Sequence, residues 1–239
     1  MNITYCKDYE TMSEVAGSLV ISEIQTRKNS MLCMATGNSP MGLYNKLVES
    51  SQVDQAIFKE LRLVKLDEWG GVHENDPITC EYYLRTRVLN PLKISSDRYI
   101  SFISNPLHPE EECRRVQSEL DQQGPIDICI LGLGKNGHIG FNEPDSHLQP
   151  FCHVANLSED SLTHSMVQSM DQKPNFGLTL GMKDILNSRK IILLVTGKDK
   201  KKVIEHLEQK KVTTNLPASF LWLHKSVECI IDQNVFLKS

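Results

Sequence analysis

The chain has 239 residues, of which 40% are hydrophobic and 23% are charged, a balance typical of globular proteins with a substantial core. Its formal net charge of −4 argues against general nucleic-acid binding, which needs a basic face. No apolar run approaches the roughly 20 residues of a membrane-spanning helix, and residues 1–10 lack the apolar centre of a signal peptide. We therefore expect a cytoplasmic protein that binds neither nucleic acid nor membranes.

Seven cysteines are scattered along the chain, and no two form a Cys-x-x-Cys pair. Their odd number and their spacing predict neither a disulfide framework nor a metal site. A small phosphorylated ligand remains compatible with the negative net charge, because backbone N–H groups and one lysine suffice to hold a phosphate.

The pattern of apolar residues predicts alternating helices and strands in one domain, residues 1–239. In chain order these are helix 8–28, strand 31–35, helix 41–50, strand 61–66, helix 77–92, a short strand or loop at 101–103, helix 109–123, strand 126–131, helix 180–187, strand 191–195, helix 203–211, an apolar segment at 217–224 and strand 227–232. This alternation predicts an α/β fold whose mostly parallel sheet carries helices on both faces. Residues 145–180 are the least periodic, and we expect them to form a lid or wall beside a site.

The first strand is followed by Thr36, Gly37, Asn38 and Ser39, with Pro40 next. Proline fits the first position of a helix, so Ser39 is predicted to cap it. Hydroxyl and backbone donors at a helix N-terminus form a candidate anion site, and a plain capped connection is the alternative.

The second strand ends at Asp67 and Glu68, which precede Trp69 and two glycines. Open α/β sheets bind their ligands at the carboxyl ends of strands, so Asp67 is a candidate site residue. Asp67 can instead be a turn residue. We assign Glu68 a structural role and Trp69 a place in the core.

Residues 132–144, Gly-Leu-Gly-Lys-Asn-Gly-His-Ile-Gly-Phe-Asn-Glu-Pro, follow the central strand and hold four glycines. An amide, an imidazole and a carboxylate lie among them at Asn136, His138 and Glu143. Such groups can hold an alcohol and move its proton. The stretch also matches Gly-x-Gly-x-x-Gly, but a dinucleotide site needs a helix directly afterwards, and Gly140 and Pro144 disfavour one.

Four lysines, at 198, 200, 201 and 202, precede the helix predicted at 203–211. A solvated helix start is the ordinary interpretation of such a cluster. Lysines at a helix N-terminus nevertheless oppose the helix dipole, so an anion bound there would compensate them.

Three of these motifs closely resemble the glucosamine-6-phosphate deaminase/isomerase family: residues 36–40, residues 66–69 and residues 132–144. The resemblance runs along nearly the whole chain. Residues 64–69, 178–187 and 217–224 look more like the galactosamine-6-phosphate isomerase branch of that family.

The resemblance implies a Rossmann-like fold and conversion of an amino-sugar phosphate to a ketose phosphate and ammonia, without a metal or organic cofactor. It implies that Asp67 is the base for enolisation and that His138 opens the sugar ring, with Asn136 and Glu143 as its partners. It further implies that residues 36–39 and Lys200 bind the phosphate. Galactosamine 6-phosphate, giving tagatose 6-phosphate, is the expected substrate, and glucosamine 6-phosphate, giving fructose 6-phosphate, is the alternative.

One departure from the family pattern concerns the phosphate. Glucosamine-type members often carry a phosphate-binding arginine after the Glu-Pro motif, whereas residues 157–170 contain neither arginine nor lysine. Lys200, Lys173 or another subunit of a homo-oligomer can supply the missing charge.

Two other functions compete with the deaminase. A 6-phosphogluconolactonase-like hydrolase would share the fold and a sugar-phosphate site, but lactone hydrolysis does not require proton abstraction from carbon. A non-enzymatic sugar-phosphate sensor ranks last, because the sequence shows no helix-turn-helix segment or basic arm.

Overall fold

A computed structural model gives the fold and describes residues 1–73, 76–162 and 173–237. Its main sheet has seven strands in the order β1-β10-β9-β6-β2-β3-β5, and every neighbouring pair is parallel. The strands are β1 (Asn2–Cys6), β2 (Met31–Met34), β3 (Arg62–Lys65), β5 (Tyr99–Ile100), β6 (Ile128–Gly132), β9 (Lys190–Val195) and β10 (Val227–Asp232). The predicted α/β fold with a mostly parallel sheet is therefore confirmed.

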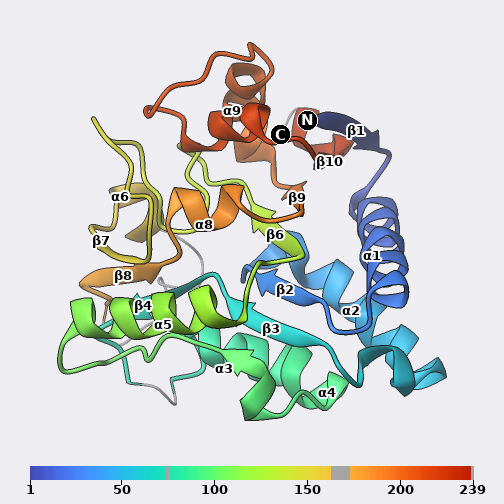
Figure 1. Cartoon of the computed structure of the whole chain (residues 1–239). Coiled ribbons are helices and arrows are strands. Elements are labelled where there is room, and N and C mark those ends of the chain that lie inside the picture. The colour runs from blue at the N-terminus through green and yellow to red at the C-terminus, as the bar shows by residue number, and fades with distance from the viewer. Residues whose placement is uncertain (74–75, 163–172, 238–239) are drawn as a thin grey trace.

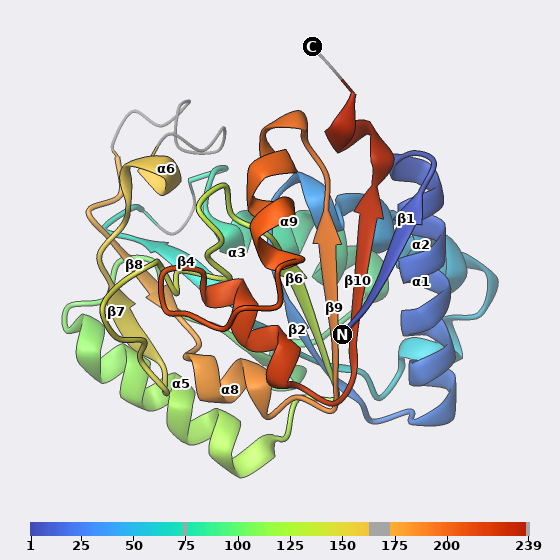
Figure 2. The ribbon, with the colours of Figure 1, turned by 90° about the horizontal axis from the view of Figure 1, so that it is seen from above.

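Helices cover both faces of this sheet, as Figures 1 and 2 show. One face packs against α1 (Tyr9–Thr26), α2 (Asn38–Val53) and the continuous run α3 (Cys80–Leu84), η2 (Arg85–Leu89) and α4 (Asn90–Leu92). The other packs against α5 (Pro109–Gln123), α8 (Met182–Leu186) and α9 (Lys201–Leu207), with the 3₁₀ segment η5 (Pro217–Leu223).

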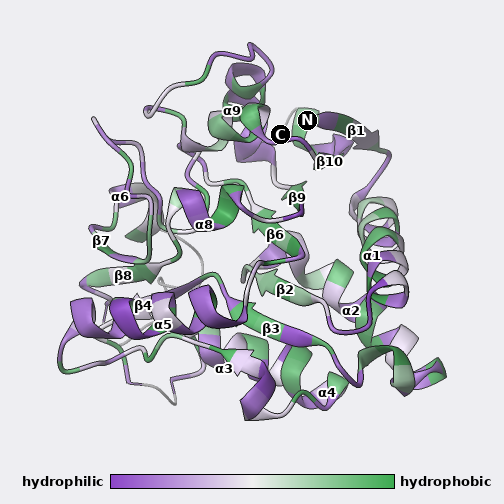
Figure 3. Ribbon diagram, viewed as in Figure 1, coloured by the Kyte–Doolittle hydropathy of each residue, from purple (hydrophilic) through white to green (hydrophobic). Residues whose placement is uncertain are grey.

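The strands feed two cores because successive side chains of a strand point to opposite faces. In β2, Leu32 and Met34 pack toward α1 and α2, whereas Met31 and Cys33 pack toward α5 and α8. The central strands are accordingly apolar on both faces, as is usual for a parallel sheet covered by helices. Figure 3 shows these strands as hydrophobic and the outer surface of α5 as hydrophilic.

A second, antiparallel sheet stands beside the first, and the sequence pattern did not predict it. Its strands are β4 (Asp67–Gly70), β8 (Phe176–Thr179) and β7 (His153–Ala155). The expectation of an irregular segment at 145–180 is thus wrong where the chain forms β7, α6 (Glu159–Leu162) and β8. These elements of three or four residues are too short for a periodic pattern to reveal them. Residues 163–172 of that segment lie outside the described part.

The other differences from the prediction are one missed strand and the bounds of two helices. Strand β1 was missed because its five residues form a mostly exposed sheet edge without an apolar pattern. The helix predicted from residue 77 begins at Cys80, where the Thr79 side chain accepts a hydrogen bond from the Tyr82 backbone N–H. The helix expected at 203–211 spans Lys201–Leu207 instead.

Candidate active site

A cavity of about 710 Å³ opens at the carboxyl end of the main sheet. Four loops line it: those that follow β2, β3, β6 and β9. Strands β2 and β6 are neighbours in the sheet, and the strand order runs in opposite directions from them. Open α/β sheets bind their ligands in the crevice at such a reversal, so the fold itself places a site here.

Asp67 lies on one wall of the cavity, as the first residue of β4, where it pairs with Thr179 of β8. A Cβ atom on Gly140 would lie 2.7 Å from Thr179 Oγ1 and 3.6 Å from Asp67 Oδ2, and Gly140 has a φ of +56°. The glycine therefore lets the loop after β6 approach the carboxylate closely.

The pKa of Asp67 is raised from 3.8 to about 7. Burial is the largest cause, the negative charge of Glu68 adds to it, and the positive charge of Lys65 opposes both. A carboxylate with a pKa near neutrality is suited to take a proton from carbon and return it, because catalytic efficiency peaks when the pKa lies near the working pH.

The charges behind Asp67 form a buried network. Lys65 Nζ lies 2.7 Å from Glu68 Oε2 and 2.9 Å from Glu81 Oε2. Glu68 also accepts hydrogen bonds from three backbone N–H groups, of Trp69, Cys80 and Glu81. The structural role expected for Glu68 fits these contacts, which tie β4 to the start of α3. Trp69 is buried against Phe141, and it also lines the cavity.

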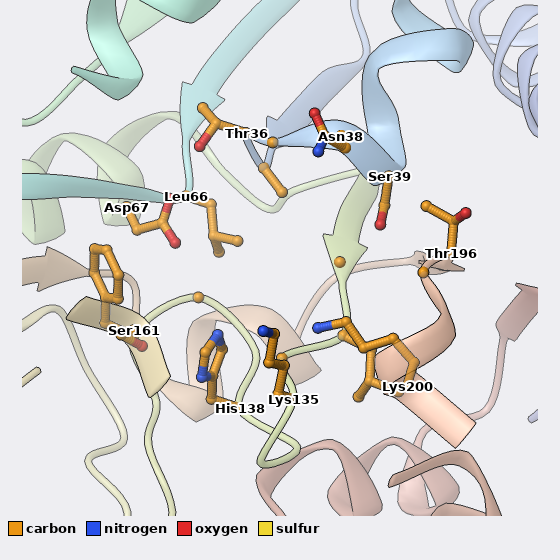
Figure 4. A pocket seen from close by; sticks show the side chains of 18 of the residues that line it. Thr36, Asn38, Ser39, Leu66, Asp67, Lys135, His138, Ser161, Thr196 and Lys200 are labelled. Atoms are coloured by element: carbon orange, nitrogen blue, oxygen red, sulfur yellow. The ribbon is translucent and has the colours of Figure 1, made fainter. Parts of the chain in front are cut away.

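His138 faces the cavity from the opposite side, as Figure 4 shows. Its Nδ1 lies 3.1 Å from Glu143 Oε2, and its backbone N–H donates to Asn136 Oδ1 over 3.1 Å. A Cβ atom on Gly134 would lie 2.5 Å from the imidazole ring, so only glycine leaves room for the ring there. With Nδ1 engaged by Glu143, Nε2 is the nitrogen left for a ligand.

Asn136 and Glu143 support His138 from behind and do not themselves line the cavity. Asn136 Nδ2 donates to Glu143 Oε2 over 2.8 Å, and the Ser161 hydroxyl donates to Glu143 Oε1. Burial tends to raise the pKa of Glu143, but the hydrogen bond and the charge of His138, followed by the bonds from Ser161 and Asn136, lower it to about 2. Glu143 is therefore a fixed negative charge that orients the imidazole.

The loop after β2 brings Thr36, Gly37, Asn38 and Ser39 to the cavity, the last two in the first turn of α2. Ser39 lies away from Asp67 (Figure 4), whereas Thr36 lies near it, because the Thr36 Oγ1 is 3.3 Å from Cys80 Sγ and that sulfur is 4.0 Å from Asp67 Oδ1. The prediction of Ser39 as the cap is wrong: Gly37, with a φ of +99°, is the cap residue, and Asn38 and Ser39 belong to the first helical turn. Two tyrosines brace this loop, since Tyr9 donates to Asn38 O and Tyr83 donates to Gly37 O. The capping residue has no side chain here, which leaves the first N–H groups of α2 open to an anion.

Lys200 lies across from this loop, in the 3₁₀ turn η4 (Lys198–Lys200) after β9. The cavity also holds residues that the sequence patterns did not single out: Thr196, Lys135, Cys80 and Ser161. Lys135 lies inside the glycine-rich stretch 132–144, where its positive charge was the one feature that could have marked it as a site residue. Thr196, Cys80 and Ser161 belong to none of the motifs found in the sequence. Lys173, the other lysine considered, is exposed and does not line the cavity.

Two cofactor hypotheses can be compared with the structure. After Gly137 the chain forms turns and an isolated bridge between Ile139 and Asn142, so the helix that a dinucleotide fingerprint requires does not follow. Among the described residues, no three His, Cys, Asp or Glu side chains are grouped as a metal site would need.

Within that same part of the chain, no helix is long and apolar enough to span a membrane.

Comparisons with known proteins agree with this geometry. The chain is 41% identical over 226 residues to an Escherichia coli (strain K12) protein named "Putative deaminase AgaI", covering 95% of this chain and 90% of that one. It is 36% identical to the glucosamine-6-phosphate deaminase of Clostridium beijerinckii, covering 98% of each chain.

Solved structures give the same result. A monomeric glucosamine-6-phosphate deaminase matches with a TM-score of 0.92 at 32% identity, covering 98% of both chains. The 6-phosphogluconolactonase of Trypanosoma brucei shares the fold, with a TM-score of 0.76 at 18% identity. Residues 9–231 match the family described as glucosamine-6-phosphate isomerases/6-phosphogluconolactonase. The chain therefore belongs to the glucosamine-6-phosphate isomerase/6-phosphogluconolactonase family.

Proposed function

We propose that the chain is an enzyme that converts an amino-sugar 6-phosphate into a ketose 6-phosphate and ammonia. Galactosamine 6-phosphate is the preferred substrate, and tagatose 6-phosphate is the product. The observation that carries the proposal is one cavity in which Asp67, with a pKa of about 7, faces His138, with anion-binding groups at the far end.

The first step is opening of the pyranose ring, which needs a proton on the ring oxygen and removal of one from the C1 hydroxyl. His138 performs both transfers through Nε2, while Glu143 and Asn136 hold the imidazole and do not touch the sugar. A permanently ionised Glu143 stabilises the protonated imidazole that forms between the two transfers.

The second step is the transfer of a proton between carbons. Asp67 takes the proton from C2 and returns one to C1, which turns the aldose first into an enolamine and then into a C2 imine. Water adds to the imine and releases ammonia, leaving the ketose. Because Asp67 is only weakly acidic, both its ionised and its protonated form are accessible near neutral pH.

The phosphate is held at the end of the cavity formed by the α2 N-terminus and Lys200. Backbone N–H groups, the dipole of a 16-residue helix and a lysine are the elements that bind phosphate in many proteins. With the phosphate anchored there, C1 and C2 of the sugar reach the space between Asp67 and His138.

Deamination is supported by the named activities of the relatives, a deaminase at 41% identity and a glucosamine-6-phosphate deaminase at 36%. The galactosamine preference depends on the resemblance of residues 64–69, 178–187 and 217–224 to that branch. Lactone hydrolysis is a weaker candidate, since the 6-phosphogluconolactonase of Trypanosoma brucei is only 18% identical to this chain. We also infer a cytoplasmic location, because all seven cysteines are free and disulfides are rare in the cytosol. Sedimentation of the purified protein would measure whether it forms a homo-oligomer.

An ammonia-release assay tests the proposal. Galactosamine 6-phosphate and glucosamine 6-phosphate are supplied separately at one pH, the ketose is identified, and kcat/KM is compared for the two. We expect ammonia from both and a clear preference for the galactosamine epimer. Preference for glucosamine 6-phosphate would refute the epimer assignment, and hydrolysis of 6-phosphogluconolactone without ammonia release from either sugar would refute the deaminase.

A further inference from the structure

The anion end of the cavity contains a second lysine besides Lys200. Lys135, from the loop after β6, and Lys200, from η4, both line the cavity. Figure 4 shows the Lys135 and Lys200 side chains on the same side of the cavity, across from Thr36 and Asn38. Two cations that converge on one space repel each other unless a negative charge lies between or beside them.

Asp199 supplies one such charge. Its Oδ2 lies 2.9 Å from Lys135 Nζ, and both side chains are 46% exposed, at the rim of the cavity. Burial tends to raise the pKa of Asp199, but the hydrogen bond from Lys135 and the charges of Lys200 and Lys135 lower it. The carboxylate is therefore ionised, and it interacts with both lysines.

Lys135, Lys200 and the N-terminus of α2 thus bring two ammonium groups and a partial positive charge to the same cavity. A phosphate monoester carries up to two negative charges and several acceptor oxygens, so it can accept from both lysines at once. A neutral hydroxyl of a sugar makes a weaker hydrogen bond to an ammonium group than a phosphate oxygen does.

We propose that Lys135 is a second cationic ligand of the substrate phosphate, held at the rim by Asp199 until the phosphate enters. This inference rests on the proposed 6-phosphate substrate and gives a source for the charge that no arginine in residues 157–170 supplies. On binding, the Lys135 ammonium turns from Asp199 toward a phosphate oxygen, while Lys200 contacts the same phosphate from the other side. The flexible stem of lysine permits this exchange without a change in the backbone.

A purely structural ion pair is the competing explanation. An exposed Lys135–Asp199 pair would then fasten the loop after β6 to η4 and contribute little to stability. Under that explanation, removal of Lys135 leaves phosphate affinity unchanged. The two explanations therefore differ in binding, which can be measured without turnover.

The experiment measures the binding of inorganic phosphate, tagatose 6-phosphate and unphosphorylated tagatose by titration calorimetry. The variants are Lys135→Met, Asp199→Asn and their combination. Lys198→Met is the matched control, because Lys198 lies in the same turn η4, is exposed and does not line the cavity. Thermal melts of each variant show whether the fold is kept.

We expect Lys135→Met to weaken phosphate and tagatose 6-phosphate binding roughly tenfold, the loss of one charge-assisted hydrogen bond at a partly exposed site. Lys198→Met should change either affinity less than about twofold. Asp199→Asn should tighten phosphate binding in the native background and less in the Lys135→Met background, because the freed ammonium is then missing. Affinity for tagatose should not respond to Lys135.

Equal losses from Lys135→Met and Lys198→Met would overturn the inference, because they would show a general field effect. Unchanged phosphate affinity in Lys135→Met would overturn it as well. If phosphate binding depends on Lys135 but no amino-sugar phosphate releases ammonia, the proposed reaction fails and the ligand role of Lys135 stands. If the native chain binds no phosphate at all, both fail.

Discussion

Replacing Asp67 by asparagine should have opposite effects on activity and stability. Asparagine keeps the shape of the side chain but cannot take a proton from carbon. Loss of a general base costs roughly 10²–10⁴-fold in rate, so turnover of galactosamine 6-phosphate should fall by that factor. Affinity for tagatose 6-phosphate should change little, since Asp67 lies on the cavity wall away from Ser39 and Lys200, as Figure 4 shows.

The gain in stability follows from the raised pKa. A shift from 3.8 to about 7 means that ionised Asp67 destabilises the folded state, by about 4 kcal/mol at 1.36 kcal/mol per pKa unit. The side chain faces a cavity that water can enter, so we expect a net gain on the order of 1–3 kcal/mol from Asp67→Asn. The sign is fixed: the folded state binds the proton more tightly, so the cost of ionisation grows as pH rises from about 4 and is complete above about 7.

Urea unfolding at pH 5 and pH 8.5 measures this effect. Asp67→Asn should exceed the native chain in unfolding free energy at pH 8.5 and approach it at pH 5, where Asp67 is mostly protonated. Asp121→Asn, an exposed position on α5, is the control and should show no comparable pH-dependent gain. In the native chain, kcat/KM should rise with pH through an apparent pKa near 7.

Two results would refute this reasoning. Near-native turnover by Asp67→Asn would show that another group is the base. A stability difference between the variant and the native chain that is the same at pH 5 and pH 8.5 would show that the carboxylate does not titrate between them.

Three further variants test other parts of the site. His138→Gln should reduce kcat/KM more for the closed pyranose than for an open-chain analogue, because ring opening is its proposed task; equal losses would assign it to the chemistry at C2. Lys200→Ala should raise KM for the 6-phosphate by roughly 10- to 100-fold but leave an unphosphorylated sugar unaffected, and an unchanged KM would return the lysine to a solvated helix start. Lys65→Met should destabilise the fold by roughly 3–5 kcal/mol, because Glu68 and Glu81 lose their shared buried cation; a loss under about 1 kcal/mol in urea unfolding would show that these carboxylates need no counter-charge.

The parallel sheet and the position of the site could be predicted from sequence because both depend on local patterns. Apolar runs such as residues 191–195 mark buried strands, and the polar residues directly after them must lie at one sheet edge. This reasoning alone predicted that Asp67 and His138 lie at the same edge of the sheet, and both line the cavity. The glycines at 134 and 140 then proved to be spacers for the imidazole and for the loop beside Asp67.

The antiparallel sheet could not be predicted, because it joins β4 to β8, more than 100 residues apart, through strands of four residues. Neither strand is long enough to show alternation, and the pairing decides their structure. The supporting positions of Asn136 and Glu143, behind His138 instead of in the cavity, likewise depend on how the loop after β6 folds back. Lys135 was missed because a lysine in a loop is ordinarily solvated, and only the folded chain brings it into the same cavity as Lys200.

The proposed reaction removes a proton from C2 and adds one to C1, which a substrate labelled with deuterium can show. Galactosamine 6-phosphate that carries deuterium at C2 is converted in ordinary water, and the product is examined by NMR and mass spectrometry. We expect a slower reaction than with the unlabelled sugar, and we expect tagatose 6-phosphate in which any remaining deuterium lies at C1. Release of ammonia with a hydroxy-aldose phosphate that keeps deuterium at C2 would mean direct replacement of the amino group, and it would rule out proton transfer between C2 and C1.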